Sequence, residues 1–393
     1  MAGRIAPNCN GRLPIEGREF AYNEEPIYEA RTHLKLYEGY EIGTNRRICI
    51  KKDFHISRIP HELKILKTLD HPHIVRHLAS QEKKDNFAYI VMDFARAASL
   101  EKTDRTNFRQ ISSIKIFAHQ LFEALKYLDS QNIIHNDLSH KNIFWDPKTN
   151  ALTLIDFDAA QRVREEKRIV KCTFSFAAPE VLLNKKNHSL QADLWSAGCV
   201  IYYLFEGFLF GPNDDSVLKN VVAQIGRPTR EFLSDCENYD LISDDENPPP
   251  CLQETLRTML ETRNLDEAEQ NQWIDLFSSL IRYESRGKAE DYLKHPLFAS
   301  LIKIRVVAEQ SMSLSISQGE EVVYSEDFTH KARECVHLTS SPEYTLTAKM
   351  GGEEKTCNLP LKEGEILHVK SLFAEPNDPK AAEPSSKKSK TDD

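Results

Sequence analysis

The eight cysteines of this 393-residue chain are scattered in a way that excludes two common kinds of site. No C-x-x-C pair occurs, and no histidine stands at metal-binding spacing from a cysteine. The pattern therefore argues against both a zinc site and a disulfide framework. We interpret the cysteines as reduced thiols, most of which fill the core.

Long hydrophobic runs are also missing. The longest apolar stretch, around residues 198–211, is interrupted by Glu206 and is too short to cross a bilayer. The N-terminal residues MAGRIAPNCNGR contain no apolar core of the kind found in a signal peptide. We therefore expect a cytoplasmic or nuclear protein that does not bind a membrane.

Negative charge outweighs positive charge. Sixty acidic residues and 51 lysines and arginines give a formal net charge of −9, so direct contact with nucleic acid is not expected. With 40% hydrophobic and 28% charged residues, the chain is typical of a globular protein long enough for two or three domains. No internal repeat is visible.

Composition divides the chain into four regions. Residues 1–19 are polar, contain Gly and Pro, and are expected to form a flexible leader. Strand-like and helix-like stretches alternate in residues 20–300, whereas residues 301–375 are strand-like and residues 376–393 are predicted to be disordered. Within the second region, the predicted strands are residues 46–52, 87–94 and 151–160, and the predicted helices are residues 59–69, 112–130 and 191–207.

One apolar stretch, IIHNDLSHKNIFW at residues 133–145, is interrupted by polar side chains. Buried polar groups need partners, so this stretch indicates either a polar network or a ligand.

Five polar groups that occur in order along the chain supply what a phosphoryl transfer needs. Lys51 ends a predicted strand, and Glu62 lies on the next predicted helix. Asp137 and Asn142 stand five residues apart in the polar stretch, and Asp156 begins Asp-Phe-Asp at the end of another strand. Each residue alone has an ordinary structural interpretation. Together they supply a cation for phosphates, oxygen ligands for Mg²⁺ and a carboxylate for the attacking hydroxyl, and they resemble the eukaryotic protein kinases.

Further motifs support this resemblance over residues 20–300. The sequence APE at residues 178–180 and the sequence DLWSAGC at residues 193–199 are similar to two signatures of the family. These motifs are most similar to those of the branch that contains the cyclin-dependent and MAP kinases. The resemblance implies a two-lobed α+β fold, with the N-lobe at residues 20–94 and the C-lobe at residues 95–300. It also implies that Arg286 pairs with Glu180.

The resemblance implies roles for the five polar groups, with ATP and Mg²⁺ as cofactors. Lys51 would hold the phosphates, with Glu62 fixing it, and Asp156 and Asn142 would bind the metal. Asp137 would accept or orient the hydroxyl of a protein substrate.

Other residues acquire implied positions in the same way. Met92 would lie in the hinge that meets adenine, and Thr173 would lie beside the catalytic aspartate. Leu66, His135 and Phe157 would stack as an apolar spine between the lobes.

The glycine-rich loop of the family has no glycine here. If IYEAR (residues 27–31) follows that loop, the loop is residues 19–26, with Phe20, Tyr22 and Glu25 in place of glycines. Side chains there would weaken nucleotide binding because they keep the backbone away from the phosphates. An alternative alignment places the loop at residues 37–43, but that segment is too close to Lys51.

The segment that regulates many kinases also differs. Asn136 replaces an arginine that receives a phosphate, and residues 159–172 contain no Ser, Thr or Tyr to phosphorylate. Glu165 or Glu166 is a candidate for fixed negative charge there, although a solvated charge run is the plainer interpretation.

Two more substitutions lie close to the implied metal site. Asp158 replaces the glycine of Asp-Phe-Gly, and Ser139 replaces the lysine of serine/threonine kinases. Lys141 stands where tyrosine kinases carry an arginine and is a candidate for reaching the γ-phosphate.

Two functional hypotheses follow for residues 20–300. The first is an atypical serine/threonine kinase that transfers the γ-phosphate of ATP to protein hydroxyls. The alternative is a pseudokinase that acts as a scaffold. A regulatory protein on the N-lobe or on the C-terminal region is a further expected partner.

Residues 301–375 are predicted to form a small β-sandwich or barrel. This all-β extension is either a packing appendage or a binding module with a faint resemblance to nucleoplasmin-type histone-binding domains. The KKSK cluster near the C-terminus is compatible with nuclear import or with simple solvation.

Overall fold

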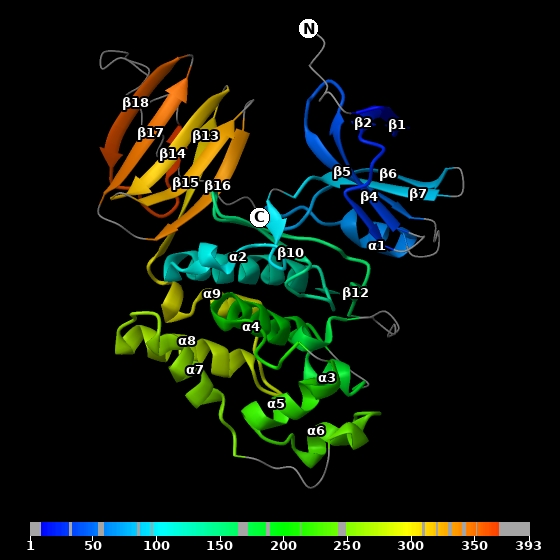
Figure 1. Ribbon diagram of the computed structural model, residues 1–393, viewed down its shortest axis with the longest axis vertical. Helices are drawn as coiled ribbons and strands as arrows, with labels where there is room; N and C mark the ends of the chain where they lie inside the picture. Colours follow the sequence, from blue (N-terminus) through cyan, green and yellow to red (C-terminus); the bar gives the residue numbers. More distant parts are fainter. Residues whose placement is uncertain are drawn as a thin grey trace, which may run out of the picture. The chain divides into compact units, whose positions relative to one another are not determined.

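The computed structural model describes residues 9–30, 34–53, 59–84, 87–95, 97–163, 172–185, 189–212, 214–242, 249–308, 311–319, 321–328, 332–339, 343–350 and 352–368 (Figure 1). The chain forms two compact units, one of residues 1–147 and 151–299 and one of residues 148–150 and 300–393. Each is described separately.

The first unit begins with a seven-stranded antiparallel sheet. Six strands follow the order β1-β2-β4-β5-β7-β6, and β3 pairs with β4 beside β2. Alternating buried and exposed side chains in β1 and β4 explain the extended conformation, because successive side chains point to opposite faces. The strands are β1 (Gly11–Ile15), β2 (Arg18–Tyr22), β3 (Tyr28–Ala30), β4 (Leu34–Glu41), β5 (Arg47–Asp53), β6 (His77–Lys84) and β7 (Phe87–Asp93).

The β1–β2 hairpin shows that the leader expected at residues 1–19 was placed wrongly from residue 11 onward. Ile15 pairs with Arg18, and the two residues between them, Glu16 and Gly17, adopt φ values of 52° and 74°. Two positive φ values define the two-residue turn that matches strand twist. Leu13, Ile15 and Phe20 are buried in a cluster with residues of β4, β5, β6 and β7, so the hairpin is part of the sheet core.

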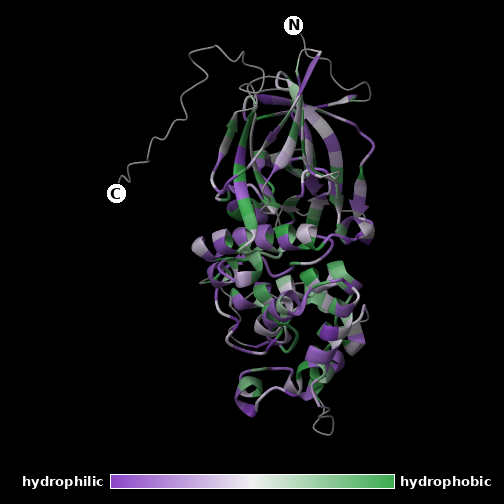
Figure 2. Cartoon of the chain, turned by 90° about the vertical axis from the view of Figure 1, so that its left-hand side faces the viewer, coloured by the Kyte–Doolittle hydropathy of each residue, from purple (hydrophilic) through white to green (hydrophobic). Residues whose placement is uncertain are grey.

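Helices make up most of the remainder of the first unit. α2 (Ile111–Ser130) buries one face, and α4 (Gln191–Glu206) is buried nearly all round, as its apolar composition predicts. Figure 2 shows hydrophobic and hydrophilic stretches along the helical ribbons of the chain. No helix in the described part of the chain is long and apolar enough to span a membrane. The other helices are α1 (Ile59–Leu66), α3 (Pro179–Leu182), α5 (Val217–Ile225), α6 (Arg230–Ser234), α7 (Leu252–Glu261), α8 (Glu267–Leu280) and α9 (Ala289–Leu293).

Short strands position the polar stretch that follows α2. Asn132 adopts φ 54°, the left-handed conformation that ends a helix and that asparagine tolerates. The chain then enters β9 (Ile133–Ile134), which pairs with β12 (Gln161–Arg162). Strands β10 (Ile143–Asp146) and β11 (Ala151–Leu154) form a hairpin, and β8 (Ala98–Ser99) pairs with β10. Residues 135–142 and 155–160 are therefore loops held between paired strands.

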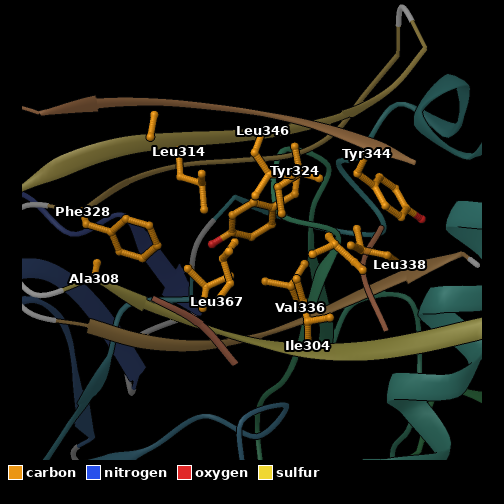
Figure 3. Close-up of a cluster of buried hydrophobic side chains, with 14 of the residues drawn as sticks. Ile304, Ala308, Leu314, Tyr324, Phe328, Val336, Leu338, Tyr344, Leu346 and Leu367 are labelled. Atoms are coloured by element: carbon orange, nitrogen blue, oxygen red, sulfur yellow. The ribbon is translucent and has the colours of Figure 1, made fainter. Parts of the chain in front are cut away.

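The second unit is a β-sandwich with its own core. Its two sheets have the orders β16-β13-β19 and β15-β14-β17-β18. Apolar side chains from both sheets point toward one another, with Leu314, Tyr324, Leu346 and Leu367 near the centre of Figure 3. The strands are β13 (Leu301–Ala308), β14 (Met312–Gln318), β15 (Glu321–Phe328), β16 (Ala332–Thr339), β17 (Tyr344–Met350), β18 (Glu353–Leu359) and β19 (Ile366–His368). The α+β fold class with an all-β C-terminal extension is confirmed.

Candidate active site

Lys51, Glu62 and Asp156 come together although they are distant in sequence. Lys51 Nζ lies 2.7 Å from Glu62 Oε2 and 3.2 Å from Asp156 Oδ1. The side chains of Lys51 and Glu62 are 9% and 3% exposed, whereas that of Asp156 is 42% exposed. The ammonium is therefore held between a buried and a more accessible carboxylate.

The charges of this cluster follow from burial and proximity. Burial alone would lower the pKa of Lys51, but the carboxylates of Asp156 and Glu62 outweigh burial and raise it. Burial raises the pKa of Glu62 to about 7, against the lowering effect of Lys51. The Lys51 ammonium lowers the pKa of Asp156. The cluster thus keeps a protonated lysine beside an ionised, accessible aspartate at neutral pH.

Asp137 is fixed by donors from two segments. Its Oδ1 accepts hydrogen bonds of 2.8 Å from both the backbone N–H and the hydroxyl of Thr173. Its Oδ2 accepts a 2.9 Å hydrogen bond from Asn142 Nδ2. Burial raises the pKa of Asp137, although the bonds from Thr173 oppose this effect. Thr173 thus lies where the resemblance implied.

Asp193 holds the backbone of the same loop. Its carboxylate accepts the N–H groups of His135 at 2.7 Å and Asn136 at 3.0 Å. His135 in turn contacts Phe157 edge to face, with ring centroids 4.9 Å apart. Leu66, the third residue of the implied spine, is fully buried on α1. The motif DLWSAGC therefore supplies a support for the loop that its sequence alone did not reveal.

The Asp-Phe-Asp turn keeps an unusual backbone. Asp156 adopts φ 63°, and the backbone N–H of Asp158 donates to its carboxylate. The side chain of Asp158 is exposed, and its charge contributes to raising the pKa values of Lys51 and Glu62. The substitution of glycine by Asp158 therefore adds a third carboxylate to the cluster.

Lys141 is placed away from the centre of the cluster. Its side chain is 54% exposed, and its ammonium lies 3.8 Å from Glu101. Among the described residues, Lys141 forms its ion pair with Glu101. That Lys141 reaches the γ-phosphate therefore stays a prediction. Glu165 and Glu166 lie outside the described residues.

Met92 is buried on β7, opposite Cys49 of β5. The next residue, Asp93, forms a two-pronged ion pair with Arg46, with both N–O distances 2.5 Å. The guanidinium of Arg47 lies 3.9 Å from the ring centre of Phe94. These two arginines fix the segment after Met92, and they were missed because neither belongs to a family motif.

The hairpin before β5 corrects both alignments of the glycine-rich loop. Leu36 of β4 pairs with Lys51 of β5, and β3 pairs with β4 in antiparallel fashion. The loop that precedes this pair of strands is therefore at residues 31–33, which lie outside the described residues. Residues 19–26 include part of β2, and residues 37–43 lie mostly in β4. The first four residues of IYEAR therefore precede residues 31–33 and do not follow the loop, because strand pairing and not residue type sets the register.

The absence of glycine survives this correction. The sequence contains no glycine between Gly17 and Gly39, so every residue from Tyr28 to Leu36, the part of the hairpin where β3 and β4 pair, carries a side chain. Ile27 and Tyr28 are 48% and 51% exposed, and Glu29 pairs with Lys35 at 2.9 Å. The hairpin expected to cover the phosphates is therefore bulkier than a glycine-rich loop.

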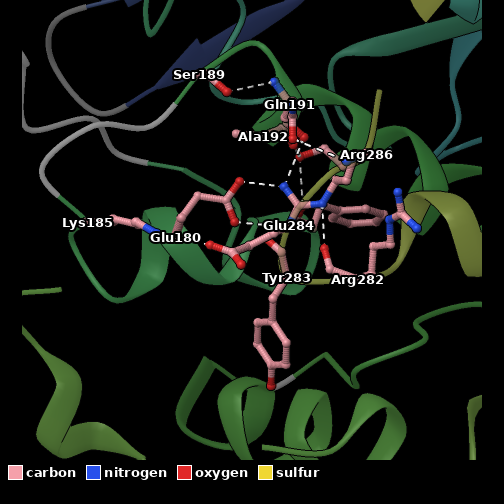
Figure 4. A network of polar contacts seen from close by, with 11 residues as sticks. Glu180, Lys185, Ser189, Gln191, Ala192, Arg282, Tyr283, Glu284 and Arg286 are labelled. Atoms are coloured by element: carbon pink, nitrogen blue, oxygen red, sulfur yellow. Dashed lines mark hydrogen bonds and ion pairs between the residues drawn. The ribbon is translucent and has the colours of Figure 1, made fainter. Parts of the chain in front are cut away.

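Glu180 and Arg286 form the buried ion pair that the resemblance implied. Two N–O distances of 2.5 and 3.0 Å join them, and their side chains are 8% and 1% exposed (Figure 4). Arg286 also donates to the backbone oxygens of Gln191, Arg282 and Tyr283. This network anchors the end of the segment that contains Thr173.

Comparisons with known proteins agree with this geometry. The family model described as the protein kinase domain matches residues 36–298, so the chain belongs to the protein kinase family. The chain is 29% identical to Glycogen synthase kinase 1 of Pyricularia oryzae over 304 residues, covering 73% of this chain and 74% of that protein. It is 24% identical to Mitogen-activated protein kinase p38a of Drosophila melanogaster over 310 residues, covering 72% and 83%.

A solved structure shares the fold. The crystal structure of the yeast RNA Pol II CTD kinase CTDK-1 complex matches with a TM-score of 0.60 and 20% sequence identity, covering 70% of this chain and 92% of that chain. The predicted membership of the eukaryotic protein kinases, near the branch with cyclin-dependent and MAP kinases, is thereby confirmed.

Proposed function

We propose that the chain is an active, atypical serine/threonine kinase that transfers the γ-phosphate of ATP to hydroxyls of protein substrates. The observation that carries this proposal is the joint presence of the Lys51–Glu62 pair and the Asp137–Asn142–Thr173 network. A pseudokinase would not need all of these polar groups to be held in reactive positions.

The donor set suits Mg²⁺, which prefers oxygen ligands. Asp156 uses one oxygen for Lys51 and remains partly accessible, and Asn142 uses its amide nitrogen for Asp137. Asp156 and the amide oxygen of Asn142 would hold the ion. When bound, Mg²⁺ would neutralise charge on the ATP phosphates.

The protein groups have separate tasks in this proposal. Lys51 stays protonated and would bind the phosphates, while Glu62 prevents its side chain from turning away. Asp137 would orient the substrate hydroxyl and accept its proton, a task favoured by the raised pKa of its carboxyl. Thr173 keeps that carboxylate in one rotamer.

The second candidate function is a pseudokinase scaffold. It is favoured by the absence of glycine from residues 28–36, where β3 and β4 pair, and by Ser139, which is completely buried where serine/threonine kinases carry a lysine. In that case the chain would bind partners, with or without ATP, and transfer no phosphate.

Phosphate incorporation by the whole chain separates the two functions. In Asp137→Ala, we expect transfer from Mg-ATP to a generic protein substrate to fall about a thousandfold, because the group that orients the hydroxyl is lost. Thermal stabilisation by Mg-ATP should change little. The matched control is Asp240→Ala, which removes an exposed aspartate on the 3₁₀ turn Tyr239–Leu241.

The outcomes are distinct. Incorporation that is equal in the parent and in Asp137→Ala would contradict catalysis by this chain. Stabilisation by Mg-ATP without any incorporation would favour a nucleotide-binding pseudokinase.

We also propose that a regulatory protein binds the N-lobe or the β-sandwich, and that the protein acts in the cytoplasm or the nucleus. The sandwich has a complete core of its own, as a binding module requires. Titration of the full chain with histones tests its faint resemblance to histone-binding domains, and no binding up to high micromolar concentration would count against it.

A further inference from the structure

Two successive backbone oxygens after the Asp-Phe-Asp turn receive side-chain donors from different parts of the kinase unit. Asn136 Nδ2, in the loop after β9, lies 3.0 Å from the carbonyl oxygen of Ala159. His61 Nε2, on α1, lies 2.6 Å from the carbonyl oxygen of Ala160. The segment is thus joined to α1 and to the catalytic loop at adjacent residues.

The turn itself is held by further bonds. His135 Nε2 lies 3.1 Å from the carbonyl oxygen of Ile155, and the N–H of Ala160 donates to Phe157 at 3.2 Å. Beyond the turn, Arg162 donates to Gln131 O at 3.2 Å and to Thr68 Oγ1, two residues after α1, at 3.3 Å. Both sides of Asp156 are therefore fixed.

His61 is well placed to control Glu62 because the two residues are adjacent on α1. A bond from His61 to Ala160 limits rotation and translation of the helix, and the helix position decides whether Glu62 reaches Lys51. The acceptor is a carbonyl, so His61 Nε2 must carry the hydrogen. A neutral imidazole supplies this donor, and no charge or phosphate is needed.

The sequence of the segment agrees with such a device. Residues 159–172 contain no hydroxyl side chain, so no phosphoryl group can be attached there to Ser, Thr or Tyr. Asn136, at the position of a phosphate-binding arginine, is instead used for the bond to Ala159. Direct hydrogen bonds thus occur where a phosphorylated kinase would use charge pairs.

We propose that His61 is a positioning residue which, together with Asn136, latches the segment after Asp156 and so keeps Glu62 and Asp156 in place without phosphorylation. This inference rests on the proposed function for its catalytic consequence, but the latch itself is a property of the folded chain.

Hydrogen exchange of the full chain tests the latch without relying on activity. In His61→Leu, amides in residues 157–163 should exchange about tenfold faster, because one hydrogen bond that opposes local opening is lost. His61→Gln keeps an N–H donor and should restore most of the protection. Exchange in α4 should be the same in all three proteins.

Catalysis supplies a second readout. In His61→Leu, kcat for a peptide should fall about tenfold with the peptide KM unchanged, and His61→Gln should recover most of the rate. Phosphatase treatment of the parent should alter neither exchange nor rate. If the parent transfers no phosphate, the proposed function fails, and the exchange data still decide the latch.

The tautomer of His61 can be measured in the parent, which removes any dependence on the folding of a variant. Imidazole ¹⁵N spectra, assigned with His61→Gln, should show hydrogen on Nε2 at pH 7.5. Hydrogen on Nδ1 alone, or exchange in residues 157–163 that is unchanged in a folded His61→Leu, would overturn the latch.

Discussion

The loop around Asp137 and the β3–β4 hairpin belong to the same candidate site but are built in different ways. In the loop, Asp137 accepts bonds from Thr173 and Asn142, and Asp193 accepts two backbone N–H groups. The hairpin instead presents exposed side chains, and its first strand lies before residue 36, where the match to the family model begins. The loop around Asp137 is therefore held by several hydrogen bonds, whereas the hairpin expected to cover the phosphates differs from the glycine-rich loop of the family.

The difference separates two properties of the proposed active site. In the proposed function, positioning of the substrate hydroxyl depends on the loop and its supports, and nucleotide affinity depends on the hairpin as well. We therefore expect changes in the supports of the loop to have large effects and changes in the hairpin to have small ones. Three variants, in descending order of expected effect, test this expectation.

Removing Arg286 should have the largest effect. In Arg286→Ala, Glu180 keeps a buried charge without its partner, and three backbone oxygens lose a donor. Loss of one member of a buried pair costs about 3–5 kcal/mol of unfolding free energy. Urea unfolding of the parent and the variant measures this loss. The control Arg282→Ala removes an exposed guanidinium nearby and should cost much less unfolding free energy. Equal losses in the two variants would show that the buried pair contributes no more than an exposed arginine.

A histidine within the loop of residues 135–142 should make stability depend on pH. His140 is buried among Phe176, Tyr203 and Phe208, with ring centroids 4.9, 4.9 and 5.3 Å away. Burial lowers the pKa of His140; the charge of Glu101 opposes this effect more weakly, and the charge of Lys141 adds to it. Because the unfolded chain then binds the proton more tightly, the contribution of His140 is present above pH 6.5 and is lost as the pH falls below it.

The variant His140→Phe isolates this contribution. As the pH falls below 6.5, the parent should lose unfolding free energy relative to His140→Phe, by up to about 1.4 kcal/mol per pH unit. Denaturant unfolding at pH 7.5, 6.5 and 5.5 measures the shift. Parallel pH profiles for the two proteins would show that His140 is protonated within the fold.

Much of the fold was predictable because each functional group stands at the end of a strand or on the next helix. That order specifies which elements must converge, and the positions of Lys51, Glu62, Asp137 and Asp156 followed from it. The β1–β2 hairpin was not predicted, because the glycines, prolines and polar residues of residues 1–19 suggest a loop. β1 is an edge strand, where a residue without an N–H is tolerated.

Other parts of the site depend on contacts that cannot be predicted from the residue types. The partner of His61 is a backbone oxygen distant in sequence, so no motif contains the pair. The register of β4 is set by pairing with β5, and a partial similarity over the five residues IYEAR was too short to establish it.

The hairpin should give the smallest effect, in the direction of stronger binding. Glu29→Gly removes an exposed carboxylate, 46% accessible, that pairs with Lys35 on the neighbouring strand. The change removes a negative charge from the hairpin expected to cover the phosphates, and it frees Lys35 to attract them. One exposed charge is worth about 1 kcal/mol or less, so Mg-ATP affinity should rise a few-fold.

Titration calorimetry with Mg-ATP measures the change in affinity, and Glu29→Gln separates the loss of charge from the gain of backbone freedom. Equal gains in both variants would assign the effect to charge, whereas a larger gain in Glu29→Gly would assign the remainder to closer approach of the backbone. Since Lys51, Asp137 and Asp156 are untouched, the rate at saturating ATP should stay within about twofold of the parent. A loss of affinity in both variants would show that the hairpin stabilises bound nucleotide through Glu29. The expected contrast between a loop that tolerates little change and a hairpin that tolerates substitution would then be wrong.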